Sequence, residues 1–120
     1  MMWNVLLFAV LLAATATEGG PLVTASHMLL PTEARAEAAL AMVRGGNDFA
    51  YMAGSLSICP TRKNGGSLGT FGPGKMVAEF DQAIFVEGPF APGTLLGPVR
   101  TALGYHVILI HSMGEGGDEL

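Results

Sequence analysis

The sequence is poor in cysteine, and Cys59 is the only one among its 120 residues. An internal disulfide needs two cysteines, and metal sites normally combine several closely spaced Cys or His side chains. A zinc site built from Cys59 and the three histidines would have a spacing that fits no local zinc motif. The sequence therefore predicts no internal disulfide and no metal site.

Basic residues are also few. Lys and Arg total 6 against 10 Asp and Glu, which gives a formal net charge of −4. A nucleic-acid-binding surface needs clustered Lys and Arg, whereas these side chains are scattered along the chain, so we expect no nucleic-acid partner. The six basic residues are Arg35, Arg44, Arg62, Lys63, Lys75 and Arg100.

The sequence also lacks a hydrophobic run long enough to span a membrane. The unbroken apolar stretch at residues 5–14, V-L-L-F-A-V-L-L-A-A, falls short of the roughly 20 residues that a membrane-spanning helix needs. It has the length of the apolar core of a signal peptide, and residues 14–16 supply small side chains for cleavage. We therefore expect a signal peptide over residues 1–16. Residues 1–4 lack Lys and Arg, so an uncleaved membrane anchor or a buried strand is the alternative.

The chain ends in an acidic, glycine-rich segment. We expect residues 114–120 to form a disordered tail. Residues 117–120, G-D-E-L, resemble the K-D-E-L and H-D-E-L endings that return proteins to the endoplasmic reticulum, with Gly in place of the basic residue. Together with an entry signal, this ending predicts residence in the endoplasmic reticulum lumen and a retrieval receptor as partner. A secreted or membrane-anchored protein is the alternative.

Local patterns predict one strand and two helices in the first half of the chain. Residues 17–23 read as a flexible lead, although the apolar pattern of a strand already runs over residues 22–30. Residues 33–44 are Ala-rich with an apolar face at helical spacing, and Thr32 is their expected N-cap. Asp48 is the expected cap of a second, shorter helix.

The second half predicts strands separated by one helix. Residues 68–71 and 97–100 are short strand candidates, and residues 77–86 have a helical pattern. Two prolines and three glycines make residues 88–97 a loop. Residues 104–111 give the strongest strand signal, and their β-branched run predicts a central strand that is buried on both faces.

The segment of residues 57–80 combines turn-forming glycines and prolines with apolar side chains. Five glycines and two prolines make it a loop region. Surface loops are usually polar, so this composition predicts a lip around an apolar pocket. The side chains that set it apart are Cys59, Leu68, Phe71, Met76 and Phe80.

This segment resembles the active-site segment of the parvulin-type peptidyl-prolyl cis–trans isomerases in its letters S-I-C-P-T-R-K-N-G-G-S-L-G-T-F-G-P-G-K-M-V-A-E-F. Residues 25–29, A-S-H-M-L, are similar to the family's first strand, and residues 97–110, G-P-V-R-T-A-L-G-Y-H-V-I-L-I, to its last two. The pieces occur in the family's order and spacing, so the resemblance covers a domain at residues 24–113. It implies an α+β fold with a four-stranded, mainly antiparallel sheet surrounded by helices.

The resemblance also implies roles for individual residues. Its pattern places four polar side chains in a catalytic network and three apolar side chains around the substrate proline. For the histidines the structural alternative is a satisfied core position, and for the apolar residues it is ordinary packing. The catalytic residues implied are His27, Cys59, Thr101 and His106, and the substrate-binding residues are Leu68, Met76 and Phe80.

The activity implied is isomerisation of X-Pro bonds in folding or extended polypeptides, without a covalent step or cofactor. Cys59 is expected to act electrostatically, because members of the family carry either Asp or Cys there. The expected partners are proline-containing peptides and unfolded proteins, and we expect a monomer. A non-catalytic peptide-binding chaperone module of the same fold is the alternative.

The chain departs from the family pattern at Ser67, at Ala78-Glu79 and at Leu103, none of which removes a pocket side chain. Phosphate-directed members have a basic loop after the first strand, whereas residues 29–32 are short and uncharged, so no phosphate selectivity is expected. The neighbouring pair Arg62 and Lys63 suggests instead a mild preference for an acidic residue before proline.

Overall fold

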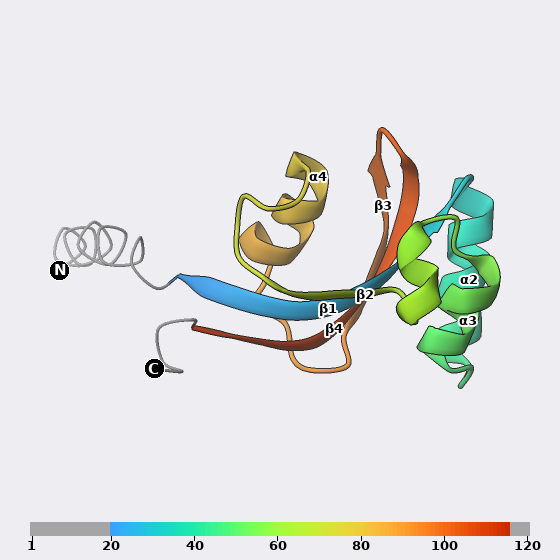
Figure 1. Ribbon diagram of the computed structural model, residues 1–120, viewed down its shortest axis with the longest axis horizontal. Helices are drawn as coiled ribbons and strands as arrows, with labels where there is room; N and C mark the ends of the chain where they lie inside the picture. The colour runs from blue at the N-terminus through green and yellow to red at the C-terminus, as the bar shows by residue number, and fades with distance from the viewer. Residues whose placement is uncertain (1–19, 116–120) are drawn as a thin grey trace, which may run out of the picture.

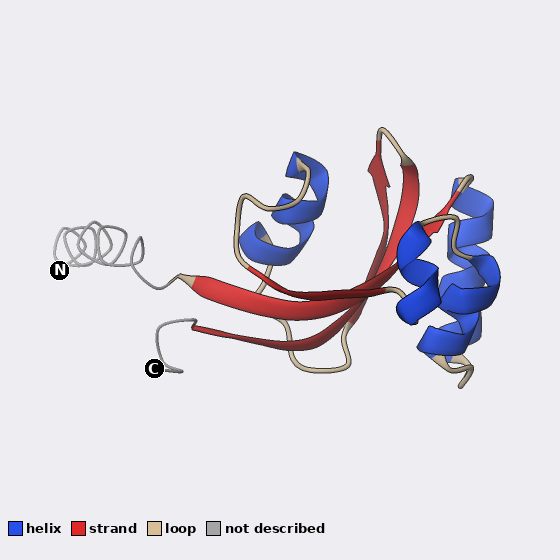
Figure 2. Cartoon of the chain, in the orientation of Figure 1, coloured by secondary structure: helices blue, strands red, loops and turns tan. Residues whose placement is uncertain are grey.

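The computed structural model describes residues 20–115. The predicted signal peptide and the G-D-E-L ending lie outside these residues. The described chain forms one antiparallel sheet with the strand order β2-β1-β4-β3, flanked by helices (Figures 1 and 2). This is the predicted α+β class with a four-stranded sheet. The strands are β1 (Pro21–Leu30), β2 (Ser67–Phe71), β3 (Leu95–Thr101) and β4 (Gly104–Glu115).

The two long central strands, β1 and β4, form the middle of the sheet. The prediction that residues 104–111 form a central strand is confirmed. The pairing extends further than predicted, because Pro21 lies opposite Glu115 at the far end of the ribbon. The expected flexible lead is therefore strand from Pro21 onward, and Val23 is completely buried. Likewise, Gly114 and Glu115, which were expected to belong to a disordered tail, are part of β4. Mutual pairing satisfies main-chain groups that neither segment could satisfy alone.

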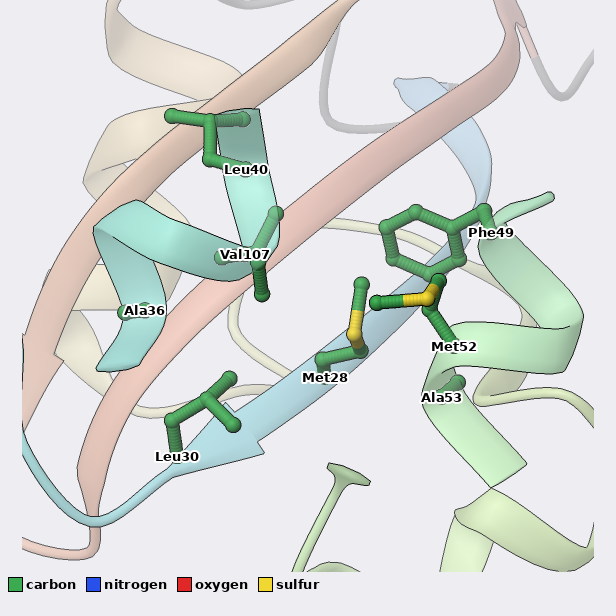
Figure 3. Packing of buried hydrophobic residues seen from close by; sticks show 9 residues of the cluster. Met28, Leu30, Ala36, Leu40, Phe49, Met52, Ala53 and Val107 are labelled. Atoms are coloured by element: carbon green, nitrogen blue, oxygen red, sulfur yellow. The ribbon is translucent and has the colours of Figure 1, made fainter. Parts of the chain in front are cut away.

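Two helices, α2 (Glu33–Arg44) and α3 (Phe49–Leu56), cover one face of the sheet. Both predicted caps are present, since the Arg35 N–H donates to Thr32 Oγ1 at 3.2 Å and the Tyr51 N–H to Asp48 Oδ2 at 2.9 Å. Side chains from the helices, β1 and β4 form the core shown in Figure 3. Its buried members include Met28, Leu30, Ala36, Leu40, Phe49, Met52, Ala53 and Val107.

A second apolar core lies on the opposite face, because side chains alternate across a strand. Here the short helix α4 (Ala78–Asp81) and the π-helical turn Gln82–Val86 that continues it pack on β1 and β4. The helical pattern predicted for residues 77–86 is thus confirmed, with a change of helix type at Gln82. The buried members are Val23, Ala25, Phe71, Phe80, Ile84, Ile108 and Ile110.

The connecting segments are more ordered than the sequence suggested. The segment of residues 57–80, expected to form a lip around a pocket, contains a 3₁₀ helix, Pro60–Asn64, which was not predicted. It also contains strand β2, which was predicted. The loop expected over residues 88–97 ends early, because β3 begins at Leu95. No helix within the described range combines the length and apolar character that crossing a bilayer would require.

Candidate active site

Two histidines from the central strands meet on the face covered by α4. His106 pairs with Leu29 across the sheet, two residues beyond His27 and on the same face, so the two rings stand diagonally beside each other. Their Nδ1 atoms are 3.0 Å apart and their ring planes are inclined by only 16°. Both side chains are buried, with 5% and 4% of their surface exposed. The pair is therefore joined by a hydrogen bond that solvent cannot easily replace.

Thr101 extends this contact toward the turn between β3 and β4. Its Oγ1 lies 2.8 Å from Nε2 of His106, and it accepts a hydrogen bond of 3.2 Å from the N–H of Leu103. Thr101 ends β3 and pairs with Gly104, so the tight turn itself holds the hydroxyl against the ring. The result is one connected chain of polar groups from the turn to His27.

Counting donors limits how the protons of this chain can be arranged. Leu103 N–H already donates to Thr101, and the hydroxyl has one proton to give. If that proton goes to His106 Nε2, then His106 Nδ1–H donates to His27 Nδ1; if His106 Nε2–H donates to Thr101, then His27 Nδ1–H donates to His106 Nδ1. In both arrangements the two Nδ1 atoms are engaged with each other, so Nε2 of His27 is the ring atom left for a further partner.

Both imidazoles are neutral near pH 7. Burial, reinforced by repulsion from His106, lowers the pKa of His27 from 6.5 to about 4. Burial also lowers the pKa of His106. Removing an ionised ring from water is costly, so the buried pair stays uncharged. It can thus orient hydrogen bonds without placing a net charge beside an apolar wall.

Phe80 forms that wall. Its ring stands edge-on to His106, with centroids 5.3 Å apart and planes at 90°, and contacts His27 at 5.8 Å. Leu68 and Met76, half-buried, pack against the same cluster from β2 and from the loop before α4. The three apolar residues predicted from the sequence therefore belong to one cluster, and Phe80 is its member that contacts the histidine pair.

Cys59 stands at the edge of this arrangement. It is half-buried, and its N–H donates to Ser57 Oγ at 3.2 Å. The neighbouring Ile58 N–H donates to the Leu29 carbonyl at 2.9 Å, which ties the cysteine segment to β1. Within residues 20–115, however, no hydrogen bond joins the thiol to the histidines, and His27 Nε2 is a buried atom without a partner. The polar chain thus ends at an unbonded ring nitrogen.

Ser57 is a structural member of the site that sequence reasoning missed. Its side chain is 1% exposed and its Oγ accepts the N–H of Leu29 at 3.0 Å as well as that of Cys59. It therefore fixes where the cysteine segment meets β1. A serine that follows a helix reads as an ordinary cap in the sequence, and the only available signal was its place at the start of the glycine-rich segment.

A charged cleft opens beside Thr101. It has a volume of about 530 Å³ and is lined by Glu79, Arg100, Thr101 and Ala102. The Arg100 guanidinium lies over the ring of Tyr105 at 5.9 Å, so its direction is restrained. Sequence reasoning noted Glu79 as a departure from the family and overlooked Arg100. Their carboxylate and guanidinium bound the cleft into which Thr101 faces.

His111 lies apart from the site. It is exposed within β4, on the face opposite His106, and its Nε2 is 2.8 Å from Ser26 Oγ. It had been expected at the end of a strand, but β4 runs on to Glu115. Across the part of the chain that the structure describes, no three His, Cys, Asp or Glu side chains gather in a metal-binding arrangement.

Comparison with known proteins identifies the class to which this fold and site belong. The family model of the rotamase, or PPIC-type PPIase, domain matches residues 14–112. The chain therefore belongs to the parvulin family of peptidyl-prolyl isomerase domains, as the sequence resemblance implied. The match begins within the small residues that were read as a cleavage site.

Particular relatives are foldases and parvulins. The chain is 42% identical over 96 residues to the foldase protein PrsA of Geobacillus sp. strain WCH70, covering 79% of this chain and 34% of that protein. The crystal structure of PrsA from Bacillus cereus has a TM-score of 0.72 at 35% identity, over 79% of this chain and 36% of that one. The parvulin of Nitrosopumilus maritimus has a TM-score of 0.68 at 30% identity, over 78% of this chain and 98% of that one. The chain spans about a third of the length of the curated PrsA relatives.

Proposed function

We propose that this chain accelerates cis–trans isomerisation of X-Pro bonds in extended or folding polypeptides, without a covalent intermediate. The observation that carries the proposal is the contact of Phe80 with the buried, hydrogen-bonded pair of His27 and His106. An apolar wall and neutral polar groups meet there, and the reaction needs both.

The barrier that this chain would have to lower is the barrier to rotation about the X-Pro peptide bond. Amide resonance gives the peptide bond a rotation barrier of about 18–20 kcal/mol, and uncatalysed X-Pro exchange takes tens to hundreds of seconds. Lowering the barrier by about 7 kcal/mol would accelerate exchange about 10⁵-fold. Apolar side chains around the proline ring would exclude water, and preorganised donors would favour the twisted amide over the planar one.

In this proposal the polar chain works by orientation. Thr101 and His106 fix the His27 ring so that Nε2 is its free end. A polar atom of the client, or the Cys59 thiol, would complete the chain at that end. We assign Cys59 an electrostatic role, since a thiol nucleophile needs a hydrogen-bonded base and no hydrogen bond within residues 20–115 joins the Cys59 thiol to a histidine.

We propose unfolded proteins and proline-containing peptides as clients. Relatives named foldase protein PrsA support this. A Campylobacter jejuni structure that is 33% identical to this chain also supports it, since its description names PEB4 and Cj1289 as SurA-like chaperones. The exposed Arg62 and Lys63 on the 3₁₀ helix after Cys59 favour an acidic residue before proline. The absence of basic residues at positions 29–32 argues against phosphate selectivity.

The second candidate is a peptide-binding chaperone module without catalysis. The observation that favours this candidate is that no hydrogen bond joins the Cys59 thiol to the histidines within residues 20–115. A site with such an incomplete polar chain could bind proline without twisting its amide. The intact pair His27 and His106 beside Phe80 favours the enzyme.

We also propose that the protein enters the secretory pathway and resides in the endoplasmic reticulum lumen. Only the sequence supports this, through the apolar run at residues 5–14 and the G-D-E-L ending. N-terminal sequencing of the mature protein should begin near Thr17. An intact Met1 would contradict cleavage, and relocation to the medium after deletion of residues 117–120 would support retrieval.

A protease-coupled assay tests the activity. The purified protein is added to short X-Pro peptides that differ only in the residue before proline. Acceleration of the slow phase, largest for Glu or Asp, is the expected result. Peptide binding without acceleration would leave the chaperone module as the function.

A further inference from the structure

The loop that carries Met76 connects β2 to α4 over residues 72–77. Most of it is exposed, whereas Met76 is half-buried against the cluster that contains Phe80. Gly74 in this loop has φ of +88°, a conformation that favours glycine. A loop so open to solvent needs specific ties if Met76 is to keep one position.

Asp81 supplies two such ties. The N–H of Gly74 donates to Asp81 Oδ1 at 3.0 Å, and the N–H of Asp81 donates to the Val77 carbonyl at 2.9 Å. Gly74 and Val77 lie on either side of Met76 in the chain. One residue therefore holds the loop at both ends of the short segment that presents the methionine.

The position of Asp81 links this segment to the imidazole pair. Asp81 follows Phe80 directly on α4, and Phe80 contacts both His27 and His106. A carboxylate on the same short helix therefore ties the loop of Met76 to the helix that carries Phe80. Glu79, also on α4, instead lines the cleft beside Thr101 and makes no such tie within the described residues.

We propose that Asp81 is a positioning residue for client binding, which acts through Met76 by accepting the Gly74 N–H. This inference rests on the proposed function, since it assumes that Met76 contacts the client proline. Asp81 itself touches neither the client nor the imidazoles. Its loss frees the loop, so that part of the binding free energy is used to order Met76 again.

Three substitutions of Asp81 distinguish the effect of its hydrogen-bond acceptor from the effect of its negative charge. Asp81→Ala removes the acceptor, Asp81→Asn keeps a carbonyl oxygen in place without charge, and Asp81→Glu keeps the charge but moves it by one methylene. We expect KM for an X-Pro peptide to rise about fivefold in the Ala and Glu variants, the effect of one net hydrogen bond. The Asn variant should stay near the parent protein, and kcat should change less than KM in all three.

Glu87→Ala is the matched control, because Glu87 is an exposed acid at the end of the same helical segment. It should leave KM unchanged. The Asp81→Ala change is also made in a Met76→Ala background, where it should have almost no further effect if Asp81 acts through Met76. Full additivity of the two changes would overturn the positioning role.

Other outcomes are equally decisive. Parent-like KM in the Glu variant, or an equal rise in the Asn and Ala variants, would show that the placed acceptor is not what matters. If Asp81→Ala does not fold, the Asn and Glu variants alone decide. If the parent protein gives no acceleration, the proposed function fails. Asp81 is then tested by the dissociation constants of the same peptides, with the same pattern of variants expected.

Discussion

The Nδ1 atoms of His27 and His106 lie 3.0 Å apart although 79 positions separate the residues in the sequence. The antiparallel pairing of β1 and β4 creates this contact, and Thr101 orients it from the neighbouring turn. Because both rings are buried and neutral, they form a fixed set of dipoles beside Phe80. The predictions below follow from that arrangement.

The stability of the protein should fall as the pH drops from about 6.5 to about 4. In this window unfolded chains protonate His27, whose folded-state pKa is about 4, so the unfolded state binds more protons. The contribution is fully present above pH 6.5 and levels off below the folded pKa. A loss on the order of 3 kcal/mol is expected, measured as the free energy of unfolding in urea at several pH values.

The control for this titration is a pair of histidine substitutions. His27→Gln should reduce the pH dependence, because the contribution of His27 is gone and only that of His106, whose pKa burial also lowers, remains. His111→Gln should keep it, since His111 is exposed on the other face of the sheet. An equal slope in the parent and the His27 variant would contradict the assignment.

Replacing Thr101 with Val should disconnect the polar chain while keeping the side-chain shape. His106 Nε2 and the Leu103 N–H would then lose their partner, at a cost of about 1–3 kcal/mol in the free energy of unfolding. Imidazole nitrogen spectra should show a changed distribution of the proton over the two ring nitrogens of His106. Thr101→Ser retains the hydroxyl and should preserve both quantities; the same loss in both variants would point to packing instead.

Met76→Ala should lose most of the isomerase turnover and keep the fold, because the side chain is only half-buried. Phe80 is 3% exposed, so Phe80→Ala would also cost about 3–5 kcal/mol of stability. Phe80→Leu is the better test, as it keeps much of the volume but removes the edge-on contact with His106. Normal turnover in Met76→Ala would refute its place in the proline pocket.

Gly66→Ala should destabilise the protein far more than Gly69→Ala. Both glycines have positive φ, but a Cβ on Gly66 would lie 2.3 Å from the His27 carbonyl oxygen, whereas Gly69 has open space. The Gly69 variant therefore measures backbone strain alone, about 1 kcal/mol. Thermal unfolding of the two variants makes the comparison, and equal midpoints would show that Gly66, which directly precedes β2, does not approach His27 this closely.

Much of the fold could be predicted because the signals are local. The cap at Thr32 and the β-branched run at residues 104–111 act on their own neighbourhoods, and the structure has both. The ends of the sheet could not be predicted in this way. Pro21 and Glu115 are strand residues because they pair with each other, and a pairing between distant segments leaves little trace in either one.

The candidate site also has parts that the sequence could predict and parts that it could not. The resemblance named the side chains that meet beside the sheet, including His27, His106 and Phe80. It could not foresee the parts that depend on main-chain geometry. Ser57 and Asp81 act by accepting backbone N–H groups, and such bonds are set by loop conformation rather than by a residue pattern.

The most direct test of the account is exchange spectroscopy on an X-Pro peptide with separate NMR signals for its cis and trans forms. A small fraction of the protein should produce cross-peaks between the two forms within a second, an exchange too fast for the free peptide. The Met76→Ala variant should weaken them strongly. Shifted peptide signals without cross-peaks would mean that the chain binds proline but does not turn its bond, and would contradict the account.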